Sequence, residues 1–320
     1  MRLFDIRRSP SWLRVIGELL TALYMGAIAW IAAATHIHYI LFPELGALSH
    51  DVITRPHGTW AKAPGMLVFT PLLTGLVGAL LVQNMGSGIV PILLATAAAI
   101  LIIRVLKSPI APAISAGVLP ISLNITSWYY PAALLLGLTL LAAISLIWRR
   151  IVPPPQVRTA VDVADDITEE TPRSYSWLPF FLAFLAGTAA LAETTGWRLI
   201  LFPPLIVIGF EMFAHSDVCP WAKKPIQLPI ACTLSALIGV ALVTAFGNAP
   251  LAVVASTICG ILILRVFDLH VPPALAVGLL PFVIPAVDYR FVASVGIGTL
   301  LLTLFFLVWH KLRKTPLSPP

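Results

Sequence analysis

Long apolar runs with almost no charge are the feature that most constrains this chain. Of its 320 residues, 59% are hydrophobic and only 11% are charged, whereas an ordinary soluble domain carries roughly 25% charged residues. A helix needs about 20 apolar residues to cross a bilayer. Residues 15–35, 65–83, 88–106 and 127–148 are runs of that kind. The chain is therefore predicted to be an all-α, multi-pass integral membrane protein.

An internal repeat then predicts the architecture. Residues 104–120 and 265–281 align without a gap at a spacing of 161 residues. A Trp-Ala-Lys motif recurs at the same spacing. Duplicated groups of membrane segments are common in transporters. We expect a polytopic helical bundle of two parallel repeats, residues 1–150 and 177–320, each with about six membrane segments.

The segment between the repeats is polar. Residues 151–176 contain a run of prolines and five acidic residues, with few apolar side chains. Such a composition cannot bury enough apolar surface to fold by itself. We expect a disordered cytoplasmic linker.

Each repeat also has short apolar segments that contain proline: residues 36–53, 108–124, 199–215 and 271–285. Proline removes an amide donor and disfavours helix before it. Non-helical backbone at membrane depth survives only when it is buried in protein or lines a cavity. These segments are expected inside the bundle, either crossing the membrane or re-entering it.

Charge decides between the two topologies. If the short segments cross, all 20 Lys and Arg except Arg198 and Arg290 lie on the side of the N-terminus. If they re-enter, Lys and Arg are divided almost evenly between the two sides of the membrane. Because cytoplasmic loops carry excess Lys and Arg, we expect twelve crossings, with both termini cytoplasmic, in the inner membrane of a bacterial cell. The net charge of +6 is then a topology signal, and no nucleic-acid partner is expected.

Two arginines at matching positions are candidates for anion binding. Arg104 and Arg265 end long spans, and Pro112 and Pro273 follow them. A helix that starts at such a proline points free amides at an anion, and an arginine complements it. The alternative is that both arginines only anchor helix ends at the interface.

Other polar residues in the repeats have similar double interpretations. Lys62 and Lys223 each lie close after a tryptophan and either guide an anion or anchor the interface. Glu44 and Glu211 lie within short apolar segments, where a carboxylate carries protons or forms a structural ion pair. His270, next but one to Asp268, serves as a proton relay or as a structural histidine.

The sequence lacks metal-binding motifs and the motifs of common enzyme classes. The histidines and the three cysteines have no metal-ligand spacing, so no metal is expected. No nucleophile elbow, phosphate loop or nucleotide fingerprint occurs, so no cofactor and no catalytic residue is expected.

The stretch Asp-Leu-His-Val-Pro-Pro-Ala at 268–274, followed by Gly-Leu-Leu-Pro at 278–281, resembles the HPP family of integral membrane proteins. The resemblance covers residues 199–285 and, more weakly, 39–124. A valine separates His270 from the two prolines, which departs from the contiguous His-Pro-Pro of the family. The resemblance implies a small multi-span membrane protein, with some relatives linked to nitrite transport.

These observations predict a transporter or channel for a small solute, such as the inorganic anion nitrite, with the lipid bilayer as its surroundings. A homo-oligomer is compatible with the sequence. One alternative is a membrane-embedded enzyme that acts on a lipid or quinone through Glu211, Asp268 and His270. Another is a scaffold that transports nothing.

Overall fold

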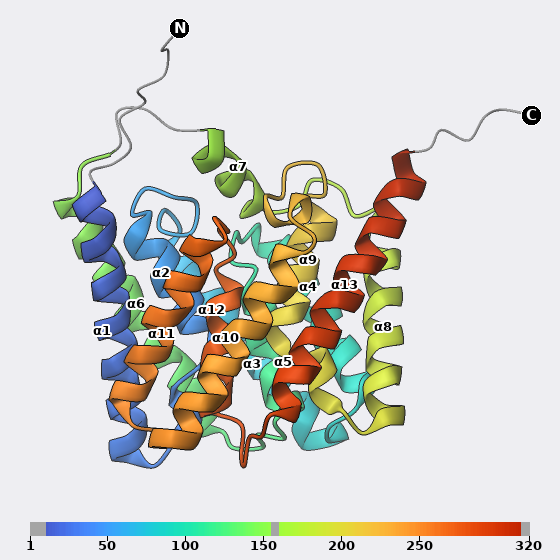
Figure 1. The fold of residues 1–320 in the computed structure, drawn as a ribbon, viewed down its shortest axis with the longest axis horizontal. Coiled ribbons are helices and arrows are strands. Elements are labelled where there is room, and N and C mark those ends of the chain that lie inside the picture. The colour runs from blue at the N-terminus through green and yellow to red at the C-terminus, as the bar shows by residue number, and fades with distance from the viewer. Residues whose placement is uncertain (1–10, 155–159, 315–320) are drawn as a thin grey trace, which may run out of the picture.

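The computed structural model describes residues 11–154 and 160–314, and every element in these ranges is helical. Seven of the helices are long and apolar enough to cross a membrane. They are α1 (Ser11–Thr35), α3 (Pro64–Met85), α4 (Ile89–Leu106), α6 (Tyr129–Ile151), α8 (Leu178–Thr195), α10 (Gln227–Phe246) and α13 (Arg290–Lys314). The chain thus has the spans of a multi-pass helical membrane protein (Figure 1).

The remaining elements are shorter. The α-helices are α2 (Glu44–Thr54), α5 (Ala113–Ser122), α7 (Ala160–Thr168), α9 (Pro203–Ala214), α11 (Pro250–Val266) and α12 (Pro273–Leu279). Single 3-10 turns are η1 (His38–Ile40), η2 (Arg198–Leu201), η3 (Trp221–Lys223) and η4 (Leu280–Phe282).

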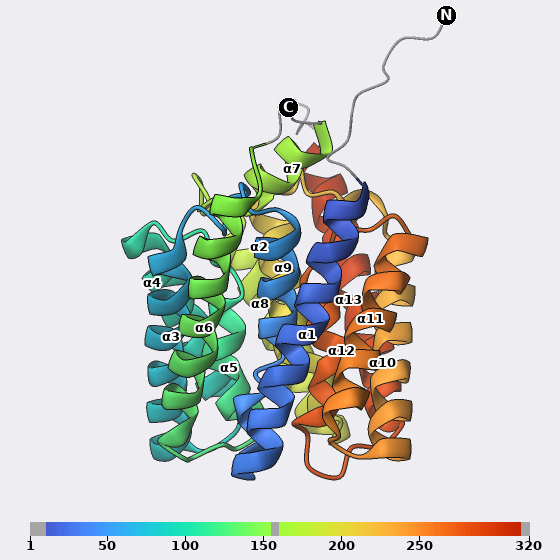
Figure 2. The same cartoon turned by 90° about the vertical axis from the view of Figure 1, so that its left-hand side faces the viewer.

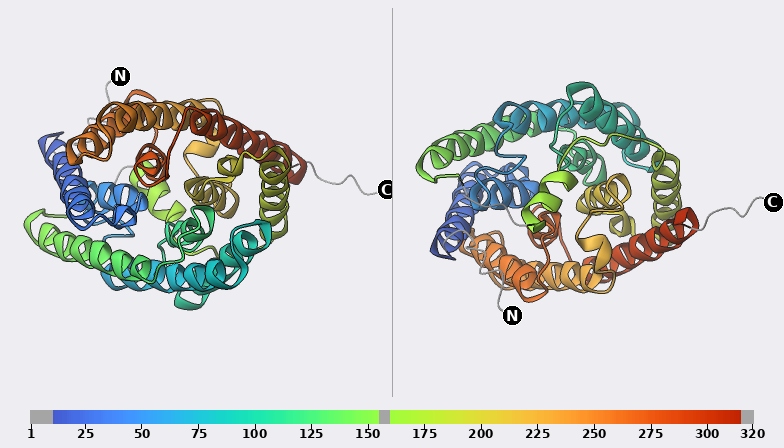
Figure 3. Two further views of the ribbon diagram at one scale, coloured as in Figure 1. Left: turned by 90° about the horizontal axis from the view of Figure 1, so that it is seen from below. Right: turned by 90° about the horizontal axis from the view of Figure 1, so that it is seen from above.

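Helices α1, α3, α4, α6, α8, α10, α11 and α13 form an oval outer ring, and α2, α5, α9 and α12 lie inside it (Figure 3). Around the ring, α1 packs on α11, and α8 packs on α4. Each of these contacts joins an early part of the chain to a late part. The first and second halves of the molecule are therefore interlocked, rather than lying side by side as two closed bundles.

Burial explains this division into ring and interior. Every residue of α9 from Pro203 to Phe213 is buried, and so is α5 from Ala113 to Ile121. The seven long outer helices bury less than half of their apolar windows and expose leucine, valine and phenylalanine to the surroundings. The expectation that the short proline-containing segments lie inside the bundle is confirmed, because their interrupted backbone is enclosed by the ring.

Glycines allow the inner helices to approach the ring closely. A Cβ on Gly78 of α3 would lie 2.0 Å from the carbonyl oxygen of Gly117 in α5. A Cβ on Gly239 of α10 would lie 2.2 Å from that of Gly278 in α12. The Thr74 hydroxyl also donates to the Ala113 carbonyl at 2.6 Å. Small residues here serve close helix contact, as in many membrane bundles.

The segment between the halves differs from the expected disordered linker. Residues 155–159 are outside the described ranges, but residues 160–168 form α7, which lies across the end of the bundle where α1 begins and α6 ends (Figure 2). Its acidic residues Asp165 and Asp166 are buried against the bundle. The physical reason is charge: Arg55, which directly follows α2, pairs with Asp166 and Glu169, and composition alone does not reveal this.

Candidate functional site

A polar cluster lies between α7 and the end of α2. We call it the capped cluster and define it as Asp51, Arg55, Asp165, Asp166, Glu169 and His270. Asp51 lies in the last turn of α2 and Arg55 caps the C-terminal end of that helix, where their side chains form an ion pair at 2.8 Å. His270 comes from the connection between α11 and α12. The cluster therefore joins the first half, the linker and the second half.

Arg55 is the centre of the capped cluster. Its Nη1 donates to Asp51 Oδ1 at 2.8 Å and also bonds Glu169, while Nη2 bonds Asp166. The His270 ring lies against the same atoms, with Nε2 at 3.4 Å from Arg55 Nη1 and at 3.5 Å from Asp51 Oδ1. A second carboxylate, Asp165, lies 3.9 Å from Nε2. One guanidinium thus serves three carboxylates.

Negative charge exceeds positive charge within the capped cluster. Its four carboxylates face one arginine, with His270 as the only other basic group among its members. Three carboxylate oxygens have no hydrogen-bond partner in the described part of the chain: Asp51 Oδ2, Asp165 Oδ1 and Glu169 Oε2.

Burial shifts the ionisation of these groups. Desolvation raises the pKa of Glu169 well above its usual value, and the neighbouring Asp51 carboxylate raises it further. Desolvation likewise raises the pKa of Asp165. For Arg55, desolvation alone lowers the pKa, but the surrounding carboxylates, Asp51 first, raise it above the ordinary value. The guanidinium is permanently charged, whereas the carboxylates compete for it.

The capped cluster contains a set of groups that could hold a metal ion. One ligand atom each from Asp51, Glu169 and His270 lies within 4.8 Å of the other two. Imidazole and carboxylate together are the donors of many divalent transition-metal sites. The spacing argument in the sequence did not find this set, because its members come from three distant segments.

Two further carboxylates lie deeper among the inner helices. Glu44 at the start of α2 and Glu211 in the last turn of α9 are both buried. Neither oxygen of Glu44 has a hydrogen-bond partner among the described residues, although the Ser115 side chain of α5 lies close by. One oxygen of Glu211 is also unpartnered. The sequence-based choice of these residues as intramembrane carboxylates is consistent with their burial.

The structure places the four predicted basic residues elsewhere. Arg104 is exposed and lies over the Tyr175 ring at 4.7 Å, and Arg265 is exposed and pairs with Glu18. Lys62 and Lys223 are exposed as well. Arg104 and Arg265 do not meet, and neither contributes to the capped cluster.

The helix register explains the position of the two arginines. The residues just before them, Ile103 and Leu264, face the interior and are buried. One step along an α-helix turns the next side chain by about 100°, which carries both arginines off the inward face. The structure thus favours the interface-anchor interpretation over the anion-facing one.

The remaining candidates are divided between the interior and the surface. Pro112 precedes α5 and Pro273 begins α12, both buried in the interior. Asp268 has a fully exposed side chain and pairs with Lys224 at 3.1 Å. Because Asp268 is at the surface while Glu211 is buried, these two do not converge with His270 on one catalytic site, which weakens the enzyme alternative.

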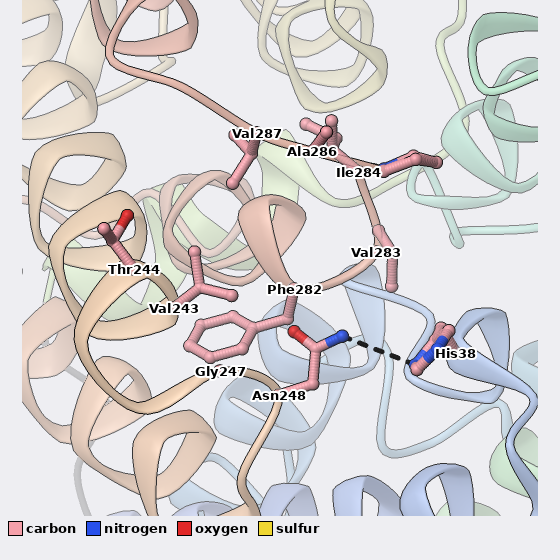
Figure 4. A pocket seen from close by; sticks show the side chains of 11 residues that line it. His38, Val243, Thr244, Gly247, Asn248, Phe282, Val283, Ile284, Ala286 and Val287 are labelled. Atoms are coloured by element: carbon pink, nitrogen blue, oxygen red, sulfur yellow. Dashed lines mark hydrogen bonds between the residues drawn. The ribbon is translucent and has the colours of Figure 1, made fainter.

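A pocket opens at the other end of the bundle, away from α7. Its cavity of about 540 Å³ is lined by the stretch from Phe282 to Val287, by the turn between α10 and α11, and by His38. Asn248 of that turn lies 3.4 Å from His38 Nδ1 (Figure 4). Only one of its lining residues is titratable, so the pocket is not a charged binding site.

Sequence reasoning missed most of the capped cluster. No sequence motif singles out Asp51 or Arg55, and the other acidic residues of the cluster lie in the segment expected to be a disordered linker. One local signal was present: an Asp and an Arg at i and i+4 at the end of a short apolar segment. The partners of that pair lie more than a hundred residues away, which no local pattern reveals.

Comparisons with known proteins found no matching family model, no similar curated protein and no similar solved structure.

Proposed function

We propose that this protein is a multi-pass membrane transporter for a small solute, coupled to the movement of a cation, with the proton as the first candidate. The observation that carries the proposal is the pair of buried carboxylates on short inner helices, Glu44 and Glu211. Ionisable groups inside a membrane bundle are expensive and mark ion pathways. Short helices preceded by non-helical backbone are also the elements that bind substrates and ions in many transporters.

The coupled species is proposed from the sign of the interior charge. Beyond the capped cluster, the interior carries Glu44 and Glu211, whereas no arginine of the described chain is fully buried and Arg55, 13% exposed, is already paired. An acidic interior stabilises protons or metal cations and repels anions. An anion such as nitrite, expected from Arg104 and Arg265, therefore has weaker support as the solute.

The proposal includes two parallel repeats with twelve crossings. The element order α1–η1–α2–α3–α4–α5–α6 recurs as α8–η2–α9–α10–α11–α12–α13, apart from small 3-10 turns. Lys107 and Asp268, 161 residues apart, both adopt positive φ (50° and 48°) just after α4 and α11. The glycines that end α3 and α10 also match at this spacing, with φ of 71° and 63°. Matching chain reversals support duplication.

The orientation is proposed from charge. The ends of α4, α6 and α11 at the α7 side carry basic residues, among them Arg104, Arg149 and Arg265, whereas Arg198 and Arg290 lie at the opposite end. The positive-inside rule then puts α7 in the cytoplasm. Membership of the HPP family, which residues 199–285 suggest, remains a prediction.

Transport by purified protein in proteoliposomes tests the function. A panel of small ions and neutral solutes, nitrite included, is offered to vesicles loaded with a pH-sensitive dye. We expect solute-dependent proton movement that falls at least tenfold in Glu44→Gln and in Glu211→Gln, since each substitution removes a proton-binding carboxylate at nearly constant volume.

Glu193→Gln is the matched control, because Glu193 is an exposed carboxylate near the end of α8. It should transport like the unaltered protein. Flux that persists unchanged in both buried-carboxylate variants sinks the assignment, and the absence of flux for the whole panel counts against a transporter.

A further inference from the structure

The capped cluster has unused acceptors for a cation. Asp51 has no exposed side-chain surface, and the Glu169 side chain is only 4% exposed. Each nevertheless keeps one oxygen, Asp51 Oδ2 and Glu169 Oε2, without a hydrogen-bond partner among the described residues. A buried, unpaired carboxylate oxygen is costly. Two of them in one cluster indicate a ligand that supplies positive charge.

The composition of the cluster indicates the kind of ligand. His270 brings an imidazole nitrogen to the two carboxylates, and the three ligand atoms lie within 4.8 Å of one another. Carboxylates alone would suit Ca²⁺ or Mg²⁺, but a histidine shifts the preference toward divalent first-row transition metals such as Zn²⁺ and Mn²⁺. Three protein ligands leave further coordination positions open for water.

We propose that Asp51, Glu169 and His270 bind one divalent transition-metal ion at the α7 end of the bundle. In the metal-free arrangement, Arg55 Nη1 bonds Asp51 and Glu169 and supplies the positive charge. The metal binds the free oxygens, Asp51 Oδ2 and Glu169 Oε2, and the imidazole of His270. Arg55 keeps Asp51 Oδ1, Glu169 and Asp166 as its partners, so the guanidinium stays paired when the ion binds.

An ion at this place has a mechanical consequence. Asp51 belongs to an inner helix of the first half, Glu169 follows α7, and His270 precedes an inner helix of the second half. One ion therefore ties the linker to both halves of the molecule. The bound metal fixes α7 over the ends of the inner helices, and after its removal Arg55 still links the carboxylates of Asp51 and Glu169.

Direct binding tests the site without relying on transport. Full-length protein in detergent is stripped with a chelator and titrated with ZnCl₂ or MnCl₂ in a calorimeter, with MgCl₂ for comparison. We expect one Zn²⁺ or Mn²⁺ per chain, weaker binding of Mg²⁺, and a rise in Tm with added metal, because a ligand that binds only the folded state stabilises it.

Ligand variants then locate the ion. Glu169→Gln and His270→Ala should each weaken binding at least tenfold, since each removes a ligand. Glu170→Gln is the matched control, because the neighbouring side chain is exposed and contributes no ligand, and it should bind normally. His270 is only partly buried, so its replacement is compatible with folding.

The proposal is overturned if the stripped protein binds neither Zn²⁺ nor Mn²⁺, or if both ligand variants bind as tightly as the unaltered chain. Either result leaves the transport proposal standing, because that one rests on Glu44 and Glu211. Conversely, if the protein binds a metal but transports no solute of the panel, the metal site is supported and the transport proposal is not.

Discussion

At the scale of single residues, Arg55 holds the capped cluster together. Its side chain is only 13% exposed and bonds Asp51, Asp166 and Glu169. Removing one partner of a buried ion cluster leaves the other charges uncompensated. This guanidinium therefore contributes strongly to the stability of the α7 end of the bundle.

Arg55→Ala is expected to destabilise the protein by about 3–5 kcal/mol, the usual penalty for breaking a buried pair. The readout is the midpoint of thermal unfolding in detergent without added metal, together with protease sensitivity in the α7 region. Arg290→Ala is the control, because its side chain is 80% exposed and its contact with Asp288 is 3.9 Å long. Equal midpoints for Arg55→Ala and the control would contradict the role given to Arg55.

At the scale of elements, the packing of inner helices on the ring depends on backbone contact. The carbonyl oxygen of Gly117 lies where a side chain at Gly78 would have to fit, and the carbonyl of Gly278 does the same for Gly239. Backbone atoms cannot rotate away as a flexible side chain can. Close helix contact at these two points is thus a requirement of the fold.

Gly78→Ala should cost roughly 1–3 kcal/mol, because the added methyl overpacks the contact between α3 and α5. Gly65→Ala, in the same helix, has open space around its Cβ position and should change stability by no more than about 0.5 kcal/mol. Both values come from unfolding in a mixed-detergent series. A Gly78→Ala variant as stable as Gly65→Ala would mean that α5 does not approach α3 as described.

At the scale of the whole molecule, the two halves complete each other. Helix α1 packs on α11 of the second half, and α8 packs on α4 of the first. Inner helix α2 packs on α12, and α5 packs on α9. Neither half encloses its own inner helices without the other.

Residues 1–154 and 155–320 expressed from separate genes should therefore assemble only together. We expect the tagged first half to co-purify with the second half and to aggregate or be degraded alone, since its buried contacts with α11 and α12 are then lost. Size-exclusion chromatography in detergent and membrane yield provide the readout. A first half that is stable and monomeric by itself is the contrary result.

The sequence by itself determined the membrane class and the place of the short segments. Apolar runs of bilayer length can satisfy their backbone only as helices. Proline-containing segments such as residues 108–124 cannot face lipid, so they had to be enclosed. Both conclusions need only local chemistry. The same is true of the choice of Glu44 and Glu211 as buried carboxylates, since both lie within apolar segments.

Only the tertiary structure decided which polar residues meet. Arg104 and Arg265 looked like partners along the sequence, but the helix turn directs both to the surface. Asp51, Glu169 and His270 share no motif, yet three separate segments bring them within 4.8 Å. Electrostatic energy depends on distance in space and on burial, not on separation along the chain. The acidic linker was therefore interpreted as solvated, although a buried arginine holds it on the bundle.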